Sequence, residues 1–172
     1  MEDPLISGIA HDKSLAKITV VGVPDRPGAA AKVIGAVSTA GVSIDMIVQN
    51  VSTSPEGLSD ISFTLPEVDG TVAVAAVREL QHELGVADVL YTSHVGKLSL
   101  VGAGLRSNPA VAQRMFGALA EAGINIEMIS TSEIRISVIT DQEALEAAVR
   151  AVHSAFRLDA EAEAVIYGGT GR

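Results

Sequence analysis

An internal repeat of about 80 residues constrains the fold of this chain more than any other feature of its sequence. Gly22 aligns with Gly102 at an offset of 80 residues, and Gly41 aligns with Gly123 at an offset of 82. Further matches at the second offset are Gly35 with Gly117, Asp45 with Glu127, Met46 with Met128 and Ile47 with Ile129. Because two copies of one unit fold alike, the 172 residues are expected to form two small domains.

Hydrophobic periodicity predicts the element order βαββαβ for each copy. Short apolar runs at 17–23 and 97–103 predict buried strands, and apolar residues at helical spacing follow each run. Later segments alternate strictly, which is typical of antiparallel strands with one solvated face. The residues expected to point inward are Ala30, Val33, Ile34, Val37, Ile61, Phe63, Leu65, Val74, Val77, Leu80 and Leu84 in the first copy, and Ala112, Met115, Phe116, Leu119, Ile134, Ile136, Val138, Leu145, Val149, Val152 and Phe156 in the second.

The predicted fold class is therefore α+β, with two ferredoxin-like units. Each unit is expected to contain a four-stranded antiparallel sheet with two helices on one face. We expect the first domain at 17–95 and the second at 96–172, with fourth strands near 88–94 and 163–167. The segment 5–16, with a strand at Leu5–Ala10, is expected to extend an edge of the second sheet. Long unpaired edges favour pairing between chains, so a dimer or higher assembly through the sheets is expected.

Local signals mark the ends of the first helix in each copy. Pro27-Gly28 and Asn108-Pro109 are expected to open these helices, because proline is tolerated in a first turn. Gly41 and Gly123 stand where a left-handed C-cap is expected.

Composition excludes several classes of function. There are 12 Lys and Arg against 21 Asp and Glu, and the net charge of −9 argues against binding to nucleic acid or an anionic membrane. Aromatic residues make up 3% and Trp is absent, so base-stacking surfaces are poorly supplied. There is no Cys, which excludes disulfides and thiolate metal sites. The acidic N-terminus does not resemble a signal peptide and no apolar stretch is long enough to span a membrane, so a cytoplasmic location is expected.

The sequence predicts no catalytic centre, no metal site and no cofactor. The four histidines, His11, His82, His94 and His153, are scattered and form no metal-binding spacing. Gly102-Ala103-Gly104 follows a predicted strand, but Ser107 stands where a dinucleotide-binding motif needs its third glycine.

The turn Pro24–Gly28, with the sequence PDRPG, is the most informative polar segment. Backbone N–H groups at a helix N-terminus bind anions such as a carboxylate, and Gly28 allows close approach. Asp25 supplies a negative charge for an ammonium group. These features together describe a site for an amino-acid zwitterion. The alternative is that Asp25 and Pro27 only cap the helix.

The DRPG turn, the repeated βαββαβ order and the segments Gln49–Ser52 and Ile129–Val138 resemble the regulatory region of aspartate kinases. Residues 96–111, 124–138 and the C-terminal AVIYGGTGR extend the resemblance over essentially the whole chain. It implies a tandem of ACT domains, which bind amino acids where two such domains meet. The family's catalytic domain would lie upstream, so a free regulatory (beta) chain without its own activity is implied. Its partners would be a second copy, paired through the ACT domains, and a catalytic (alpha) chain in an α2β2 assembly.

The resemblance also implies feedback inhibition, by threonine, of ATP:L-aspartate phosphotransferase activity in the lysine, threonine and methionine pathway. Whether lysine also binds this chain stays open. The threonine-site pattern falls on Asp25, Gly28, Ala29, Ala30, Gln49, Asn125 and Ile126, and Ser52 and Ser62 resemble positions that affect feedback control. In the second copy Ala110 replaces the glycine of the turn and no acid matches Asp25, so one threonine site per chain is expected.

Three other functions share the predicted topology. The first is an ACT-type regulatory subunit of another amino-acid biosynthetic enzyme, such as acetolactate synthase. The second is an acylphosphatase-like hydrolase using Arg106 and Asn125, although the phosphate-loop motif of such enzymes is absent. The third is an RNA-recognition module, which the missing sheet aromatics and the acidic charge exclude.

Overall fold

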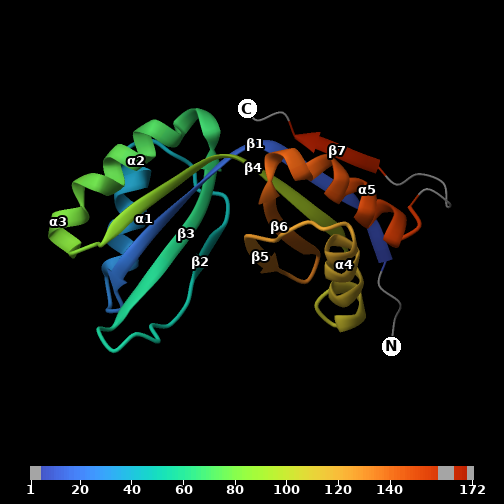
Figure 1. The fold of residues 1–172 in the computed structure, drawn as a ribbon, viewed down its shortest axis with the longest axis horizontal. Coiled ribbons are helices and arrows are strands. Elements are labelled where there is room, and N and C mark those ends of the chain that lie inside the picture. The colour runs from blue at the N-terminus through green and yellow to red at the C-terminus, as the bar shows by residue number, and fades with distance from the viewer. Residues whose placement is uncertain (1–4, 159–164, 170–172) are drawn as a thin grey trace. The chain divides into compact units, whose positions relative to one another are not determined.

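A computed structural model describes residues 5–158 and 165–169, and the chain divides into two compact units (Figure 1). One unit is the continuous segment Ser14–Ser93, which we call the inserted unit. The other combines Met1–Lys13 with His94–Arg172, and we call it the split unit. Two long strands, β1 (Leu5–Pro24) and β4 (Asp88–Ala103), contribute residues to both units.

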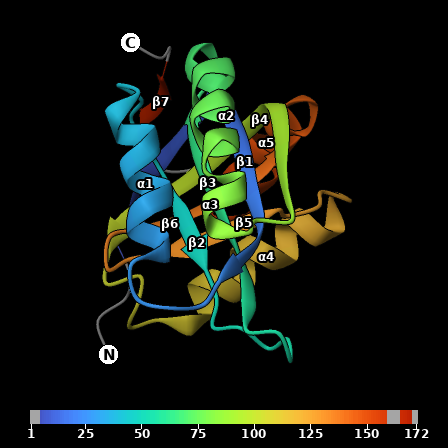
Figure 2. The same ribbon diagram turned by 90° about the vertical axis from the view of Figure 1, so that its left-hand side faces the viewer.

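The inserted unit has the strand order β2-β3-β1-β4, with its helices on one face of the sheet (Figure 2). Besides its parts of β1 and β4, its elements are α1 (Ala29–Thr39), β2 (Ile47–Gln49), β3 (Leu58–Pro66), the 3-10 helix η1 (Glu67–Asp69), α2 (Gly70–Glu79) and α3 (Gln81–Leu84). The strands β1 and β3 are antiparallel, with Ile18 opposite Phe63. Both side chains are fully buried in one cluster with Val33 of α1 and Val77 of α2. The predicted α+β class and the inward alternation of β3 are confirmed here.

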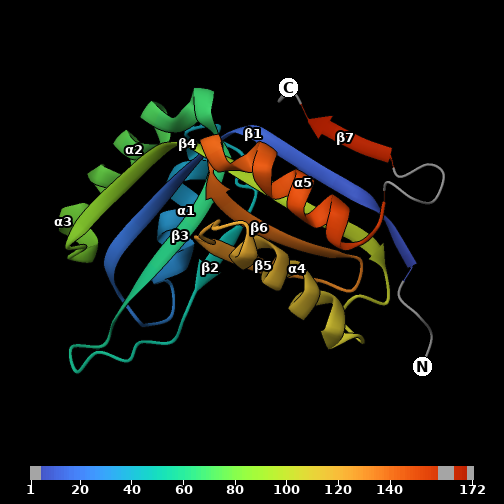
Figure 3. The same ribbon diagram turned by 45° about the vertical axis from the view of Figure 1, so that its right-hand side comes forward.

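The split unit has the strand order β5-β6-β4-β1-β7 (Figure 3). Its further elements are α4 (Pro109–Glu121), β5 (Met128–Thr131), β6 (Arg135–Asp141), the 3-10 helix η2 (Gln142–Ala144), α5 (Leu145–Ala155) and β7 (Val165–Gly169). Leu98, Met115 and Val138 are fully buried in its core, which α4 and α5 cover. The repeat thus gives both units the same helix-on-sheet packing.

The fourth strand of the split unit differs from the sequence prediction. Residues 163–164 of the expected strand lie outside the described residues, and the described strand β7 begins at Val165. It pairs in parallel with Gly8–Asp12 of β1 instead of closing the sheet beside β4. The N-terminal part of β1 occupies the place beside β4, so it lies between two strands and not at an edge. Such pairing joins the two ends of the chain, which no local pattern can reveal.

The predicted helix ends are largely confirmed. Gly41 and Gly123 have φ values of 78° and 71°, in the left-handed region expected of a C-cap. Asn108 caps α4 by accepting a hydrogen bond from the Ala110 N–H, and Pro109 begins the helix. Pro27 differs, because α1 begins at Ala29 with Gly28 as its N-cap, so the proline precedes the first turn.

One predicted inward position is wrong. Ile134, expected to point inward, lies before β6 and is 59% exposed. The regular part of β2 is short, from Ile47 to Gln49. Just before it, Asp45 and Met46 both bond the backbone of Thr64: the Asp45 N–H donates to the Thr64 carbonyl, and the Thr64 N–H donates to the Met46 carbonyl, each at 2.9 Å.

Gly22 is a position where only glycine fits. Its φ is 73°, and a Cβ at this position would lie 3.0 Å from the Cβ of Ala87. We expect Gly22→Ala to lower the free energy of unfolding by about 1–3 kcal/mol, because it adds left-handed strain to a close contact. Gly35→Ala is the matched control, since nothing lies within 4 Å of the added Cβ and α1 gains helix propensity. Urea unfolding measures both, and an equal stability of the two variants would contradict this reading.

Candidate functional site

Asp25 lies in the turn between β1 and α1 and holds the loop that joins β2 to β3. Its Oδ2 accepts a hydrogen bond from the Ser52 N–H at 2.8 Å, and its own N–H donates to the Gly57 carbonyl at 2.9 Å. No side chain caps α1, so the capping alternative does not describe this aspartate. Its side chain is exposed, and an ionised carboxylate with one occupied lone pair can accept further donors.

The start of α1 directly follows this carboxylate. Gly28 has a φ of 90°, and a Cβ there would meet no atom within 4 Å, so the backbone conformation is what requires glycine. Ala29 is buried, and its N–H donates to the Arg26 carbonyl at 3.2 Å. Ala30 is half-buried, and its N–H is one of the first-turn donors that a helix leaves without an intrahelical acceptor. Of the predicted group Gly28–Ala30, Ala29 therefore packs in the core, whereas Ala30 offers an N–H without an intrahelical acceptor.

Gln49 and Ser52 lie where β2 ends and the loop to β3 begins. Gln49 is the last residue of β2, and its Nε2 donates to the Ser59 hydroxyl at 3.3 Å. Ser52 lies in the loop after β2. Its hydroxyl donates to the Leu58 carbonyl at 2.7 Å and accepts from the Ser54 N–H at 3.2 Å. The loop is therefore fixed by its own hydroxyls and by Asp25.

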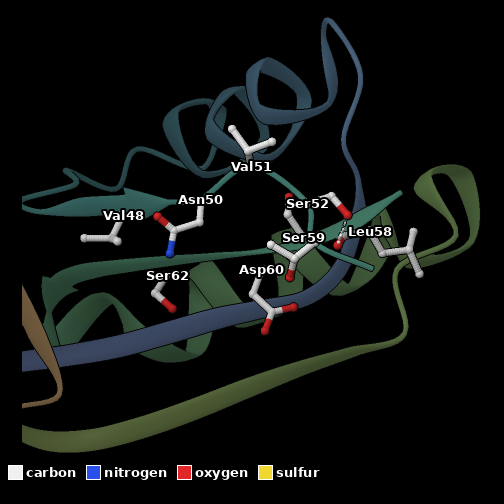
Figure 4. Close-up of a pocket in the computed structure, with 9 residues that line it drawn as sticks. Val48, Asn50, Val51, Ser52, Leu58, Ser59, Asp60 and Ser62 are labelled. Carbon is white, nitrogen blue, oxygen red and sulfur yellow. Dashed lines mark hydrogen bonds between the residues drawn. The ribbon is translucent and has the colours of Figure 1, made fainter. Parts of the chain in front are cut away.

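A shallow pocket of about 310 Å³ adjoins this loop (Figure 4). Figure 4 shows the side chains of Asn50, Asp60 and Ser62 projecting to the same side of the strands. The residues that line it are Val48, Asn50, Val51, Ser52, Thr53, Leu58, Ser59, Asp60 and Ser62. The structure therefore brings Ser52 and Ser62 to one surface, while Asp25 is not part of its lining.

Ser62 belongs to a hydroxyl pair that is repeated in both units. Its Oγ lies 2.8 Å from Oγ1 of Thr19, which stands directly opposite on β1. In the split unit, Ser99 and Ser137 stand opposite one another with their Oγ atoms 2.7 Å apart. These positions are equivalent in the repeat, so the pair is a structural link between the two central strands of each unit.

Asn125 and Ile126 belong to the split unit, in the segment between α4 and β5. Asn125 is exposed, whereas Ile126 is half-buried and packs against the split unit's core. The predicted site residues are therefore carried by both units, with the carboxylate, the glycine and the glutamine on the inserted unit.

Asp60 is a polar residue of this region that the sequence analysis did not single out. Its Oδ1 accepts a hydrogen bond from the Gly22 N–H at 3.0 Å. Strict alternation along β3 places Asp60 on the same face as Ser62, which was the available signal. Its partner is 38 residues away in the sequence, so the interaction itself leaves no local pattern.

Among residues 5–158 and 165–169, no three His, Cys, Asp or Glu side chains come together as a metal-binding group. Within those residues, no helix has the length and apolar character that a membrane crossing requires.

Comparison with protein families identifies both units. An ACT domain model matches residues 17–83, and a second ACT domain model matches residues 98–156. The aspartokinase of Mycolicibacterium smegmatis is 54% identical over 172 residues, which are all of this chain and 41% of that protein. This chain therefore spans less than half the length of that relative.

Two solved structures are matched over nearly the full length of their own chains. The regulatory subunit of aspartate kinase from Thermus flavus is 42% identical with a TM-score of 0.83, and the match covers 88% of this chain and 99% of that one. A structure of aspartokinase alpha and beta subunits is 45% identical with a TM-score of 0.81, at the same coverage. The two ACT domains and the likeness to regulatory subunits of aspartate kinase support an allosteric regulatory role for this chain. With two ACT domains and this likeness along its length, the chain belongs to the family of aspartate kinase regulatory subunits.

Proposed function

We propose that the chain binds threonine at the turn between β1 and α1 and thereby inhibits aspartate phosphorylation by a catalytic aspartokinase chain. The threonine carboxylate would bind the first-turn N–H groups of α1, where the helix carries a partial positive charge. The ammonium group would bind Asp25. The side-chain hydroxyl would bind Gln49 from the inserted unit or Asn125 from a facing ACT domain, where Ile126 would contact the ligand.

The observation that carries this proposal is the position of the Asp25 carboxylate. The Ser52 N–H fixes one of its oxygens at 2.8 Å, while the side chain stays exposed beside the start of α1. A preorganised carboxylate pays little conformational entropy when it binds an ammonium group. A negative group and a helix N-terminus within one turn are complementary to the two charges of an α-amino acid.

The proposed assembly contains a second copy of this chain and a catalytic chain. Asn125 and Ile126 lie on the split unit, so we propose that ACT domains of two copies meet to complete the site. The solved assembly of aspartokinase alpha and beta subunits supports a catalytic alpha chain as the partner. We propose the α2β2 arrangement, in the cytoplasm, as the working form.

Inhibition would follow from a shift between two conformations of this assembly. Threonine must bind the inhibited form better than the active form, since a ligand without differential affinity shifts no equilibrium. A coupling free energy of about 1–3 kcal/mol is typical of such systems. The family relationship favours aspartokinase over the two other enzymes that the topology allowed, acetolactate synthase and an acylphosphatase.

Calorimetric titration tests the ligand. We expect threonine to bind with one site per chain and valine, its near-isostere, to bind about tenfold or more weakly, because the donors for the hydroxyl would remain unpaired. Lysine is titrated alone and after threonine, and an altered lysine affinity would show that it binds the same assembly. Equal affinities for threonine and valine would contradict the proposed contact of the hydroxyl.

A further inference from the structure

An apolar patch is exposed on the inserted unit where α2 begins beside β4. Val68 is 90% exposed, Val72 is 53% exposed and Tyr91 is 39% exposed. The Tyr91 hydroxyl lies against the first turn of α2, because a Cβ on Gly70 would be 2.1 Å from it. Tyr91 on β4 therefore adjoins the turn that carries the two valines, and α2 and β4 lie side by side in Figures 1 and 2. We call Val68, Val72 and Tyr91 the edge patch.

Acidic residues lie close to the edge patch along the chain. Glu67 and Asp69 flank Val68 in the sequence, and Asp88 begins β4. Burial and the Glu67 carboxylate both raise the pKa of the Tyr91 hydroxyl, which places that carboxylate near the ring. Residues 66–77 and 86–93 contain no Lys or Arg. A partner surface complementary to this patch is apolar at its centre and basic at its rim.

The strand beside the patch has an open side. Residues 88–93 of β4 have β1 on one side, and β6 pairs on the other side only from Val95 onward. Among the described residues, no strand pairs with 88–93 on that open side. Natural edges are usually protected by Lys or Pro, and this segment contains neither.

The split unit provides an internal control for the patch. Ser62 is equivalent to Ser137, and at that same offset of 75 residues Val68 corresponds to Glu143 and Val72 to Ala147. In that unit the region is a polar hollow of about 380 Å³, whose lining includes His11, Lys13, Glu143 and Glu146. The fold therefore does not require large apolar residues at these positions, and the exposed valines of the inserted unit need another explanation.

The split unit also shows what covers such an edge. The strand beside β4 in that unit is the N-terminal part of β1, and β7 adds to its outer side in parallel at Gly8–Asp12 (Figure 3). An added strand from elsewhere is thus the way in which one copy of this fold completes its sheet. The inserted unit has the matching edge without the added strand.

We propose that an extended segment of the catalytic aspartokinase chain adds to the open side of β4 at Asp88–Ser93 and packs apolar side chains on the edge patch. A basic side chain of the same segment faces Asp69. Main-chain hydrogen bonds provide affinity in this mode of recognition, and the side chains provide specificity. This inference rests on the proposed function, which names the partner chain.

Hydrogen exchange on the complex tests the contact. The regulatory chain is measured alone and after mixing with the catalytic chain, whose binding is monitored by sedimentation velocity. We expect exchange of the amides in 88–93 to slow about tenfold or more in the complex. A complex that forms without this protection overturns the docking proposal and leaves the proposed function standing. If no complex forms, both fail. Protection that rises with concentration of the regulatory chain alone would assign the edge to a second copy and also overturn the proposal.

Charged substitutions test the patch itself. We expect Val68→Glu with Val72→Glu to weaken the association roughly 30-fold, because both charges would be buried at the centre of the contact. Glutamate is the residue that the split unit carries at the first of these positions, so the change suits the fold. Ile134→Glu is the matched control, since Ile134 is a 59% exposed apolar residue on the other unit. Unchanged threonine titration shows that the variant is folded, and unchanged association would overturn the proposal.

Discussion

Asp25→Asn is expected to weaken threonine binding by about 100-fold while leaving the thermal stability of the chain unchanged. Asparagine keeps an oxygen that can accept the hydrogen bond of the Ser52 N–H, so the loop stays in place. It removes the negative charge, and hydrogen bonds to charged groups contribute about 1.5–3 kcal/mol. Inhibition by threonine should be relieved accordingly, without a loss of activity when no threonine is present. Calorimetry and inhibition curves of the assembly measure the two effects.

Two further variants separate the charge of Asp25 from its structural role. Asp25→Ala removes both the charge and the acceptor for Ser52, so it should lose the same affinity and also some stability, about 1 kcal/mol. Asp60→Asn is the matched control, because Asp60 is an exposed carboxylate that also binds a backbone N–H, that of Gly22. It should bind threonine normally. An unchanged affinity in Asp25→Asn would remove this residue from the site.

Phe63→Ala is expected to lower the free energy of unfolding by about 3–5 kcal/mol, the largest stability effect of any change discussed. Phe63 is fully buried between the sheet and helices of the inserted unit and lies opposite Ile18 on β1 and Ile47 on β2. Its truncation removes a large apolar contact and leaves a cavity. Urea unfolding measures the loss, and hydrogen exchange in β1 and β3 locates it.

The neighbouring residue provides the control for Phe63. Ser62 lies next to it on β3 but points to the opposite face, where its hydroxyl pairs with that of Thr19. Ser62→Ala should cost only about 1 kcal/mol, the usual contribution of one hydrogen bond. A loss below about 1.5 kcal/mol in Phe63→Ala would mean that the helices do not cover this face of the sheet as closely as described.

The hydrophobic periodicity and the internal repeat together were sufficient to predict that helices cover one face of a sheet in each unit. The alternation of Ile61, Phe63 and Leu65 identified the buried face of β3, and the helical spacing of Val33 and Val37 identified the face of α1. These signals arise from burial on one side of an element, which repeats along the sequence. The caps at Gly41 and Gly123 were predictable for a different reason, because the left-handed conformation of a C-cap favours glycine.

Long-range pairing was not predictable in this way. The place of residues 5–13 beside β4, and of β7 beside them, depends on partners far apart in the chain. Ile134 fits the alternation of β6 but lies just before its first residue, Arg135, because hydrophobic alternation does not mark where a strand begins. The spacing of apolar residues describes a single helix or strand, whereas the order of strands in a sheet depends on several segments of the chain.

In the turn that carries the candidate site, the sequence predicted the local arrangement and not the hydrogen bonds. The PDRPG turn identified the start of α1 and its carboxylate, both of which lie together as expected. That Asp25 binds the Ser52 N–H, and that Ala29 is buried with its N–H on Arg26, depends on the loop after β2 and on core packing. Neither contact can be predicted from the residues of the turn alone.

The shared strand β1 has a consequence for how the chain folds during its synthesis. The inserted unit is complete once Ser93 has been made, whereas residues 5–13 must wait for β4 beyond His94 and then for β7. At typical rates of translation, about 80 residues take roughly 4–16 s. During that time residues 5–13 of β1 have no neighbour in their own unit, so they are exposed to chaperones and to other nascent chains. Residues 5–13 are made before the other described residues of the split unit, yet their partner β7 is made last.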